Sequence, residues 1–338
     1  MSVDENKKNL KIADIAALAG VSKSTVSFVL NGHAKKHRIT EDTVKKVERI
    51  VKKYNYRPNR YALALKSKIS STVGIVIPDL CNIGFANVVK ELERLYRDNN
   101  YQLLIASSED NIELEKASVQ SLLDRQVDLL IVASSMSDDS YYRDIHATTP
   151  VLFFDRNIQS DYISSVCSDQ VQSTRQVVAK LAQGLSECVY IGGQFELSPS
   201  RDRLEGFKLG LCDAKLNFKP EHVFHKDYQS DSGYLLMSDV VSQFNGLPPA
   251  LFTASYSLLE GVLRYLSEHK LLATDMKIAT FDNYSILDCL PKSIDSIEQD
   301  CQLIAKTLFD KAGALMGNSA MPRLSIILPS KLHLRSKN

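Results

Sequence analysis

Residues 12–32 read IADIAALAGVSKSTVSFVLNG, and this stretch predicts two short helices joined by a tight turn. Apolar residues recur at helical spacing in the first helix and predict its buried face. They are Ile12, Ile15, Leu18 and Ala19. Gly20 ends that helix, because glycine adopts the left-handed backbone of a tight turn without strain. Ser22 is predicted to cap the second helix by accepting a hydrogen bond from a free backbone N–H group.

The second and third helices complete a helix-turn-helix. Val26, Val29 and Leu30 form the apolar face of the second helix, and its opposite side carries Ser24, Ser27 and Phe28. The third helix begins after Thr40, and its predicted buried stripe is Val44, Val47, Ile50, Val51 and Tyr54. Two helices joined by a glycine-containing turn and braced by a third can place the second helix in the DNA major groove.

The distribution of charge favours a DNA-binding head over an ordinary helical bundle. Residues 1–68 contain 16 Lys and Arg against six Asp and Glu, whereas the remaining residues contain 25 against 34. The net charge of +1 therefore conceals a basic head on an acidic body. A basic head indicates a polyanionic partner, and the helix-turn-helix pattern identifies that partner as double-stranded DNA.

The same stretch, followed by NYRPNRYALALKS (residues 55–67), resembles the headpiece and hinge of the lactose-repressor (LacI/GalR) family. Residues 16–31 match the family pattern AxxAGVSxxTVSxVLN throughout. The resemblance implies that Lys23 and Ser24 read bases in operator DNA. It also implies that Thr25 and Ser27 help to hold phosphates and base edges, and the matched pattern ends at Asn31, which we include in the DNA-binding set.

Two features near the second helix have open roles. Phe28 is predicted either to contact a thymine methyl group or to be partly covered by the loop that follows. That loop, Gly32–Arg38, reads GHAKKHR and is longer and more basic than in many members of the family. Its Lys35, with Lys36 and Arg38, is predicted to contact phosphates; the alternative is solvated charge.

A hinge is predicted at residues 58–71, between a headpiece at 1–57 and an effector-binding and dimerisation domain at 72–338. Pro58 suits the first turn of a helix that is too short to be stable alone in water. The resemblance implies that this helix folds on operator DNA, with Leu65 wedged into a minor-groove step and Ala62 permitting close approach. It also implies that Asn59 and Arg60 contact the DNA backbone. The alternative is a plain interdomain linker.

Beyond residue 72, short apolar runs alternate with amphipathic helical segments. The runs are VGIVIP (73–78), YQLLIAS (101–107), VDLLIVAS (127–134), PVLFFD (150–155), CVYIGG (188–193), PALFTAS (249–255) and KIATFD (277–282). Continuous hydrophobicity is typical of parallel strands that are covered on both faces by helices. The sequence therefore predicts an open α/β body, with ligands bound at the carboxyl ends of its strands.

Polar side chains follow several of these runs. They are Asp79 and Asn82 after the first run, Asp155 and Arg156 after the fourth, Arg201 and Arg203 after IGG, and Asp282 after KIATF. Carboxylates, amides and guanidinium groups suit sugar hydroxyls, because they form paired, directional hydrogen bonds in a closed cleft. Each residue alone could merely cap a helix, but so many at strand ends favour a common binding cleft.

The resemblance continues through the body, in stretches such as PVLFFDRN, GGQFELSPSRDRLEGF and IATFDNYSILDCL, and within the family it is strongest to regulators of sucrose utilisation. It implies two lobes of the periplasmic-binding-protein type joined by three crossovers, the first lobe at about 72–168 plus 300–330 and the second at about 169–299. It also implies that Arg203, Asp282, Gln299 and Asp155 bind the effector.

The sequence departs from the family at Ser255 and Tyr256, where many members have an Asn-Asp pair. The hydrogen bonds of that asparagine are lost, which leaves the exact ligand open, although the tyrosine ring can stack on an apolar sugar face. Arg156 and Arg201 are expected either to pair with carboxylates or to receive the phosphate of a sugar phosphate.

These observations predict a homodimeric, cytoplasmic repressor of sugar-utilisation genes, released from a palindromic operator by a small sugar effector. Sucrose genes are favoured; the alternative is a fructose or fructose 1-phosphate responsive regulator that both represses and activates. The rival class is a sugar-acting enzyme, but no Walker loop or nucleophile elbow appears, so no catalytic residue is assigned. The six cysteines form no CxxC pair and are expected to be reduced and mostly buried, with no metal and no cofactor. No membrane partner is expected, since no apolar run has the length of a transmembrane helix.

Overall fold

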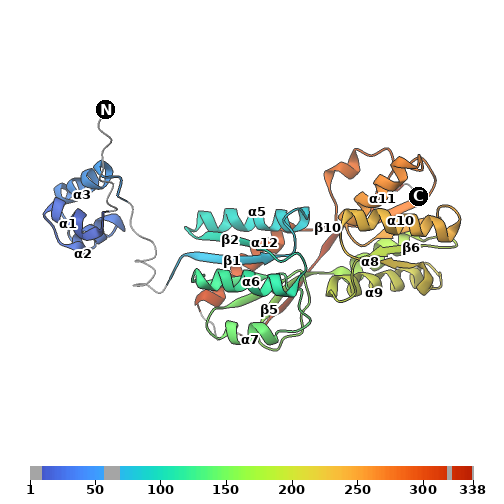
Figure 1. The fold of residues 1–338 in the computed structure, drawn as a ribbon, viewed down its shortest axis with the longest axis horizontal. Coiled ribbons are helices and arrows are strands. Elements are labelled where there is room, and N and C mark those ends of the chain that lie inside the picture. Colours follow the sequence, from blue (N-terminus) through green and yellow to red (C-terminus); the bar gives the residue numbers. More distant parts are fainter. Residues whose placement is uncertain (1–9, 57–68, 318–321, 337–338) are drawn as a thin grey trace. The chain divides into compact units, whose positions relative to one another are not determined.

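The structure is a computed structural model that describes residues 10–56, 69–317 and 322–336 (Figure 1). By its internal contacts the chain divides into two compact units, one ending at Ser70 and the other beginning at Ser71. We call them the headpiece and the body. The predicted hinge residues Pro58 to Leu65 lie outside the described residues, so the roles expected for Asn59, Arg60, Ala62 and Leu65 stay predictions.

The headpiece contains α1 (Ile12–Ala19), α2 (Lys23–Leu30) and α3 (Glu41–Lys53) around one small apolar core. Gly20 takes a left-handed backbone with φ +62° and ends α1, as its sequence position predicts. The Ser22 hydroxyl accepts a 3.1 Å hydrogen bond from the Thr25 N–H group and so caps α2. Local sequence chemistry therefore determines where these helices begin and end.

Two residues of the predicted headpiece core are exposed instead. Leu18 is 47% exposed and Tyr54 is 44% exposed, so both assignments to a buried face were wrong. The buried residues of α1 are instead Ile15, Ala16 and Ala19, and Ile12 packs against the same core. Tyr54 is the C-cap of α3, and Tyr56, two residues later, packs against the core instead.

The body alternates strands and helices along most of its length (Figure 1). In chain order the elements are β1 (Thr72–Ile77), α5 (Ile83–Asp98), β2 (Gln102–Ser107), α6 (Ile112–Asp124), β3 (Leu129–Val132), α7 (Ser140–His146), β4 (Val151–Phe154), β5 (Ser164–Ser168), α8 (Gln170–Leu181), β6 (Val189–Gly192), α9 (Ser198–Asp213), η1 (Pro220–His222), β7 (Val223–His225), α10 (Ser230–Phe244), β8 (Ala250–Thr253), α11 (Tyr256–Glu268), β9 (Lys277–Phe281), η2 (Ser285–Asp288), β10 (Ile294–Gln299), α12 (Cys301–Gly317), β11 (Ser325–Leu328) and β12 (Ser330–His333).

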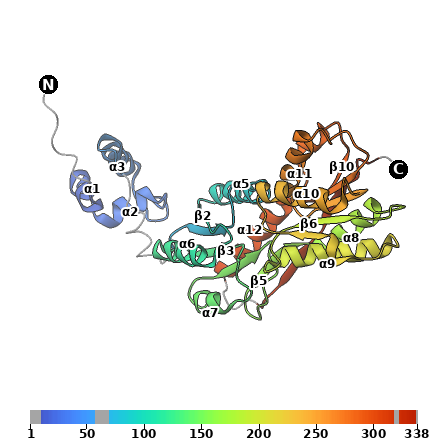
Figure 2. The ribbon, with the colours of Figure 1, turned by 45° about the vertical axis from the view of Figure 1, so that its right-hand side comes forward.

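These strands form two six-stranded sheets, one in each lobe (Figure 2). The first sheet has the order β11-β5-β4-β3-β1-β2, and all of its pairings are parallel. The second has the order β12-β10-β9-β8-β6-β7, and only β12 runs antiparallel to its neighbour. The chain passes between the sheets after β5, after β10 and after β11, so three crossovers join the lobes. The predicted fold class is confirmed.

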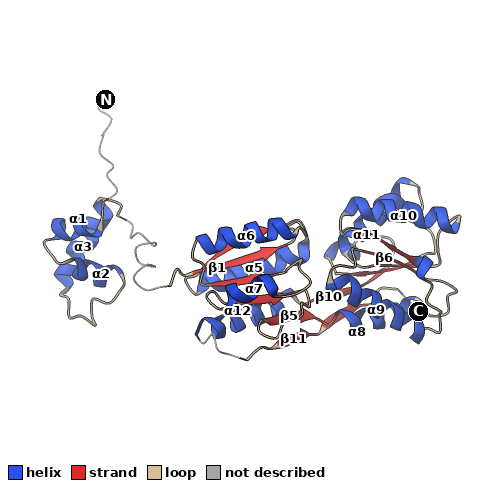
Figure 3. Cartoon of the chain, turned by 60° about the horizontal axis from the view of Figure 1, so that its bottom comes forward, coloured by secondary structure: helices blue, strands red, loops and turns tan. Residues whose placement is uncertain are grey.

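Helices cover both faces of each sheet (Figure 3). In the first lobe α5 and α12 pack on one face, and α6 and α7 pack on the other, which gives two separate apolar clusters. In the second lobe α8 pairs with α9 and α10 pairs with α11. Because both faces are covered, strands such as β3 and β4 are buried along their whole length.

All seven apolar runs form strands, but five further strands in the described part of the chain lack that signature. β5 reads SSVCS, and β7, β10, β11 and β12 are short or carry polar residues. β5 nevertheless lies between β4 and β11, and several of its serines are buried with hydrogen-bond partners such as Ser325 and the backbone of Leu324. A buried strand of this kind is invisible to a search for hydrophobicity.

The cysteines are more exposed than expected. Cys188 is fully buried, but Cys81, Cys212 and Cys289 are exposed, and all six are free thiols. The expectation of mostly buried thiols was therefore wrong. Among the described residues no single helix has the length and hydrophobicity to cross a membrane; α1 and α2 meet that criterion only as a pair, bent by 103° at their junction.

Candidate DNA-binding face and effector cleft

The outer face of α2 presents small polar side chains. Lys23 and Ser24 are exposed, and Thr25 and Ser27 are partly exposed. The hydroxyls of Ser24 and Thr25 both lie within hydrogen-bond distance of Ser22 Oγ, at 2.7 and 2.8 Å. The N-cap thus holds the first turn of α2 with its polar groups outward, which is the arrangement that reading base edges requires.

Phe28 is held by the loop that follows α2. Its ring stacks on His37 with 3.5 Å between ring centroids and 10° between ring planes. The loop therefore covers part of Phe28, which leaves the side chain half-buried. Asn31 donates a 3.3 Å hydrogen bond to Ser27 Oγ, while Lys35 in the loop is exposed.

In the body, the carboxyl ends of strands from both sheets surround one cavity between the lobes. Of the ten predicted effector residues, those that line it are Asp79, Asn82, Asp155, Arg156, Arg203, Ser255, Asp282 and Gln299. Asn82 and Ser255 also cap α5 and α11, by accepting hydrogen bonds from Gly84 N and Leu258 N. These strand-end residues therefore both cap a helix and line the cleft.

Arg203, on α9, is 5% exposed and is fixed by three neighbours. Its Nε donates to Gln170 Oε1 at 2.7 Å, and its Nη1 donates to the carbonyl oxygen of Ala254 at 2.5 Å. The guanidinium carbon lies 3.7 Å from the centre of the Phe281 ring. Within the described residues, Nη2 has no protein acceptor, so one corner of the guanidinium group is available to a ligand.

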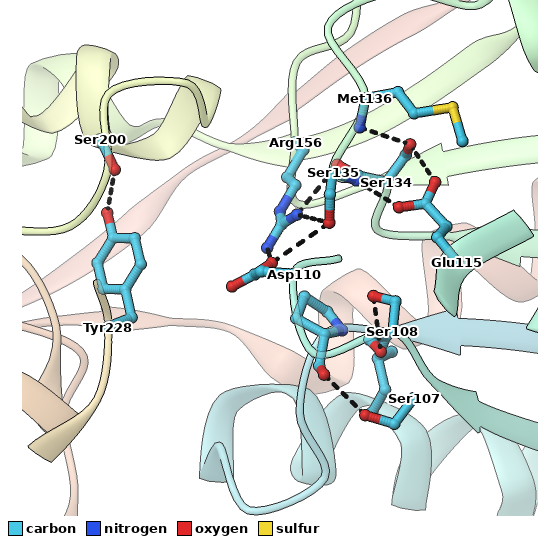
Figure 4. Close-up of polar contacts among 12 residues, drawn as sticks. Ser107, Ser108, Asp110, Glu115, Ser134, Ser135, Met136, Arg156, Ser200 and Tyr228 are labelled. Carbon is cyan, nitrogen blue, oxygen red and sulfur yellow. Dashed lines mark hydrogen bonds and ion pairs between the residues drawn. The ribbon is translucent and has the colours of Figure 1, made fainter. Parts of the chain in front are cut away.

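Arg156 lines the same cavity from the first lobe and pairs with a carboxylate (Figure 4). Its Nη2 forms an ion pair with Asp110, and its Nη1 donates to Ser135 Oγ at 3.0 Å. Its Nε is buried and has no partner among the described residues. The expected pairing of Arg156 with a carboxylate is thus present, and the guanidinium charge is already balanced.

A buried carboxylate supports the loop behind Arg156. Glu115 on α6 is fully buried and accepts hydrogen bonds from the Ser134 hydroxyl and the Ser135 N–H group (Figure 4). It also accepts one from the Tyr142 hydroxyl. Three donors satisfy this carboxylate without a cation, because hydrogen bonds can replace hydration in a buried site. Glu115 therefore fixes the serines that in turn hold Arg156.

Asp155 and Asp282 follow β4 and β9 and approach each other from opposite lobes. Both have left-handed backbones, with φ +63° and +72°, which is strained for residues other than glycine. Burial raises the pKa of the Asp155 carboxyl, and the nearby Asp282 carboxylate acts in the same direction, while Arg203 and Arg156 oppose it. Gln299 donates a 3.0 Å hydrogen bond to Asp282 Oδ1.

Two predicted effector residues do not line the cavity. Arg201 and Arg203 are two residues apart on α9, so they point to opposite sides of the helix. Arg201 is exposed and donates to the carbonyl oxygens of Phe195 and Glu196, both at 2.7 Å. The Tyr256 ring packs edge-on against Tyr284, 4.4 Å away, rather than facing the cavity.

Sequence reasoning missed several polar contributors, and three of them hold or neighbour the charged groups of the cleft. Asp110 lines the cavity just beyond β2, so the strand-end rule applied to the run YQLLIAS should have found it. Tyr228 lines the cavity from the loop after β7, which has no apolar signature, and its hydroxyl lies 2.8 Å from Ser200 Oγ. Gln170 bonds to Arg203 from the start of α8. Within the described ranges, no group of three His, Cys, Asp or Glu side chains is arranged to hold a metal ion.

A helix-turn-helix joined to a two-lobed α/β body with a polar cleft defines a ligand-responsive transcription regulator. The family of bacterial regulatory proteins named after lacI matches residues 11–59, and the periplasmic binding protein domain matches residues 73–299. The chain belongs to the lacI family of bacterial regulatory proteins. The predicted class, a sugar-responsive DNA-binding regulator, is confirmed.

Several relatives span nearly the whole chain. The chain is 40% identical to the sucrose operon repressor of Klebsiella pneumoniae, over 97% of this chain and 98% of the relative. It is 35% identical to the fructose operon regulatory protein of Vibrio cholerae, over 97% and 100%.

Two solved structures are also similar. The lac repressor dimer bound to operator and the anti-inducer ONPF superposes with a TM-score of 0.84 at 25% identity, covering 97% of this chain and 98% of that one. The Cra regulator of Pseudomonas putida with fructose 1-phosphate has a TM-score of 0.74 at 31% identity, covering 79% and 99%.

Proposed function

We propose that this chain represses genes for sucrose utilisation and leaves its operator when an uncharged sugar with a fructose ring occupies the cleft. The sucrose and fructose operon regulators among its relatives support a fructose-containing effector. The single observation that supports an uncharged ligand is the balance of charged side chains around the cavity.

The cavity is richer in carboxylates than in cations. Among the described residues, its lining includes four aspartates, Asp79, Asp110, Asp155 and Asp282, but only two arginines, Arg156 and Arg203. One arginine is neutralised by its ion pair with Asp110. Even with the Asp155 carboxyl protonated, the charges disfavour a dianionic phosphate, because like charges in a poorly solvated site repel strongly. Aspartates and amides instead suit neutral hydroxyl groups.

The cavity has room for a sugar. Its volume is about 80 Å³, several times the roughly 10–15 Å³ that one water needs. A relative that regulates a fructose operon supports free fructose as the effector, and a relative that represses a sucrose operon supports sucrose. Tyr228 adds an aromatic wall against which the apolar face of a sugar can pack.

On the DNA side, the proposal assigns base contacts to Lys23 and Ser24 and phosphate contacts to Lys35. We also propose that two copies bind a near-palindromic operator and that the hinge helices of residues 58–71 meet at its centre. Exposed apolar side chains of the first lobe, such as Ile83, Ile105 and Ile112, support a face for a second copy.

Release follows from linkage between the two ligands. If the sugar and the operator favour different arrangements of the lobes, each lowers affinity for the other by the same factor. Hinge closure around the sugar would displace the first lobes of the dimer relative to each other and separate the hinge helices. The arginine and aspartate groups that face each other across the cleft come from different lobes, as such a closure requires.

A titration of the operator complex tests the proposal. A fluorescent palindromic operator is bound to the full chain at fixed salt, because phosphate contacts make affinity steeply salt-dependent. Fructose, sucrose, fructose 1-phosphate and glucose are then added in separate arms, and anisotropy reports release. Release by fructose at the lowest concentration is expected. Release by fructose 1-phosphate alone would refute the charge argument, release by sucrose alone would replace free fructose with the intact disaccharide as the effector, and no release would refute the sensor.

We propose no catalytic role for the cleft. Carboxylate pairs also serve glycoside hydrolysis, and Asp155 and Asp282 are such a pair. Incubation of the chain with sucrose, followed by separation of the sugars, distinguishes the two functions. Accumulation of glucose and fructose in proportion to protein would replace the sensor with an enzyme.

A further inference from the structure

Gln170 is a buried polar residue at the junction of the lobes. It is the first residue of α8 and stands two positions after the end of β5, where the chain crosses from the first lobe to the second. Its side chain is almost inaccessible, since the residue is 4% exposed. A glutamine that is buried here must satisfy both ends of its amide with protein partners.

The two ends of the Gln170 amide contact opposite sides of the cleft. Oε1 accepts the 2.7 Å hydrogen bond from Arg203 Nε, which belongs to the second lobe. Nε2 donates a 3.1 Å hydrogen bond to the carbonyl oxygen of Asp155, which follows the central strand β4 of the first lobe. One side chain therefore links the cleft arginine to the backbone that carries the facing aspartate.

Helix packing and backbone conformation both support this link. α8 and α9 lie close together because Gly206 has no side chain at their contact. A Cβ at this position would be only 2.5 Å from the carbonyl oxygen of Val171. Gly206 is one turn beyond Arg203, so the close approach brings that arginine beside Gln170. The left-handed backbone of Asp155, at φ +63°, turns its carbonyl oxygen to meet the amide.

We propose that Gln170 is a positioning residue that sets Arg203 and Asp155 relative to each other and so couples sugar binding to the arrangement of the lobes. The inference rests on the proposed function, in which both groups contact the sugar. A ligand held by Arg203 and Asp155 spans the two lobes, and Gln170 makes the same connection from behind. The amide thus preorganises two groups that a sugar would otherwise have to order at its own cost.

The chemistry of the amide suggests variants that separate its two bonds. Gln170→Met keeps the length of the side chain but removes the acceptor and the donor. Gln170→Glu keeps an acceptor for Arg203 but gives up the N–H donor to Asp155. Ser198→Ala is the matched control, because Ser198 Oγ accepts a different interlobe hydrogen bond, 2.8 Å from Asn157 N, that involves neither Arg203 nor Asp155.

Sugar affinity is measured by calorimetry on the full chain, because the chain has no tryptophan to report binding by fluorescence. Fructose is the probe, with sucrose in a parallel arm. Both Gln170 variants are expected to raise the Kd for sugar at least tenfold, whereas Ser198→Ala changes it less than threefold. Operator affinity without sugar and the thermal midpoint are recorded for each variant as checks of folding.

The outcomes separate this inference from the proposed function. If the parent chain binds neither sugar, the proposed function fails. If the parent binds and folded Gln170→Met binds within twofold of it, the positioning role fails. Parent-like affinity in Gln170→Glu alone would show that Gln170 only holds the arginine, which overturns the interlobe coupling. An equal loss in Ser198→Ala would assign the effect to interlobe bonds in general and would also overturn it.

Discussion

Replacing Arg203 with lysine removes the fork of the guanidinium group while keeping its charge. Arg203 gives one hydrogen bond to Gln170 and one to the carbonyl oxygen of Ala254, and a single ammonium nitrogen cannot reach both. One buried acceptor left without a donor costs about 1–3 kcal/mol. Since 1 kcal/mol shifts the midpoint of a domain of this size by about 2–4 °C, the thermal midpoint of the body should fall by about 2–12 °C.

The effect of Arg203→Lys on sugar response should be larger than its effect on operator binding. Loss of a hydrogen bond from a charged donor to the sugar costs about 1.5–3 kcal/mol, which is about ten- to a hundredfold in affinity. In the anisotropy assay, half-release should need that much more fructose, while operator affinity without sugar changes less than about threefold. Arg201→Lys, on the opposite side of α9, is the control and should leave the response intact. Release of Arg203→Lys at the parental sugar concentration would refute the assignment of this arginine to the effector.

Three further predictions concern other parts of the chain. Ser22→Ala removes the N-cap of α2 and should cost about 1 kcal/mol of headpiece stability, seen as a lower melting temperature by circular dichroism together with weaker operator binding; an unchanged melt would contradict it. His37→Ala removes the ring that stacks on Phe28 and should weaken operator binding about two- to tenfold, whereas His37→Tyr should restore it; no difference between the two variants would count against a role for the stack. Burial raises the pKa of the Asp155 carboxyl above its usual 3.8, so the folded state holds that proton more tightly than the unfolded state. The free energy of unfolding therefore falls as the pH rises from the pKa of the unfolded state towards that of the folded state. Urea unfolding of Asp155→Asn and the parent should therefore diverge in favour of the variant as the pH rises above the usual carboxyl pKa of 3.8, and parallel pH curves would show that folding does not raise the pKa of this carboxyl.

The fold was predictable wherever local signals and burial agree. Gly20 and Ser22 define the turn of the headpiece through backbone and hydroxyl chemistry that acts within a few residues, and the structure has both. The seven apolar runs of the body are strands because covered parallel strands must be apolar on both faces. β5 was not predicted, because its buried serines form hydrogen bonds with residues 160 positions away in the sequence. No local pattern reveals such partners.

For Leu18 and Arg201 the sequence did not predict the direction of the side chain. Both sit in correctly predicted helices, yet Leu18 is exposed and Arg201 faces away from the cavity. Helical spacing determines which residues share a face, but the boundary of a buried face depends on how closely the neighbouring element approaches. The pair Arg201 and Arg203 could have been separated from sequence, because two positions along a helix are about 200° apart.

The residues that tune the cavity arise from three unrelated places: Asp110 from a loop after β2, Tyr228 from a loop after β7, and Gln170 from the crossover into α8. These three places are far apart in the sequence, and they come together only where the two sheets meet at the cleft. The strand-end residues give the site its general polarity, which suits many sugars. Asp110 then neutralises Arg156, and Gln170 fixes Arg203. The strand-end rule could have placed Asp110 at the cleft, but not its ion pair with Arg156, which lies 46 residues further along the chain. The charge that the cavity offers a ligand depends on that pairing, and for that reason the sequence alone could not separate a neutral sugar from a sugar phosphate.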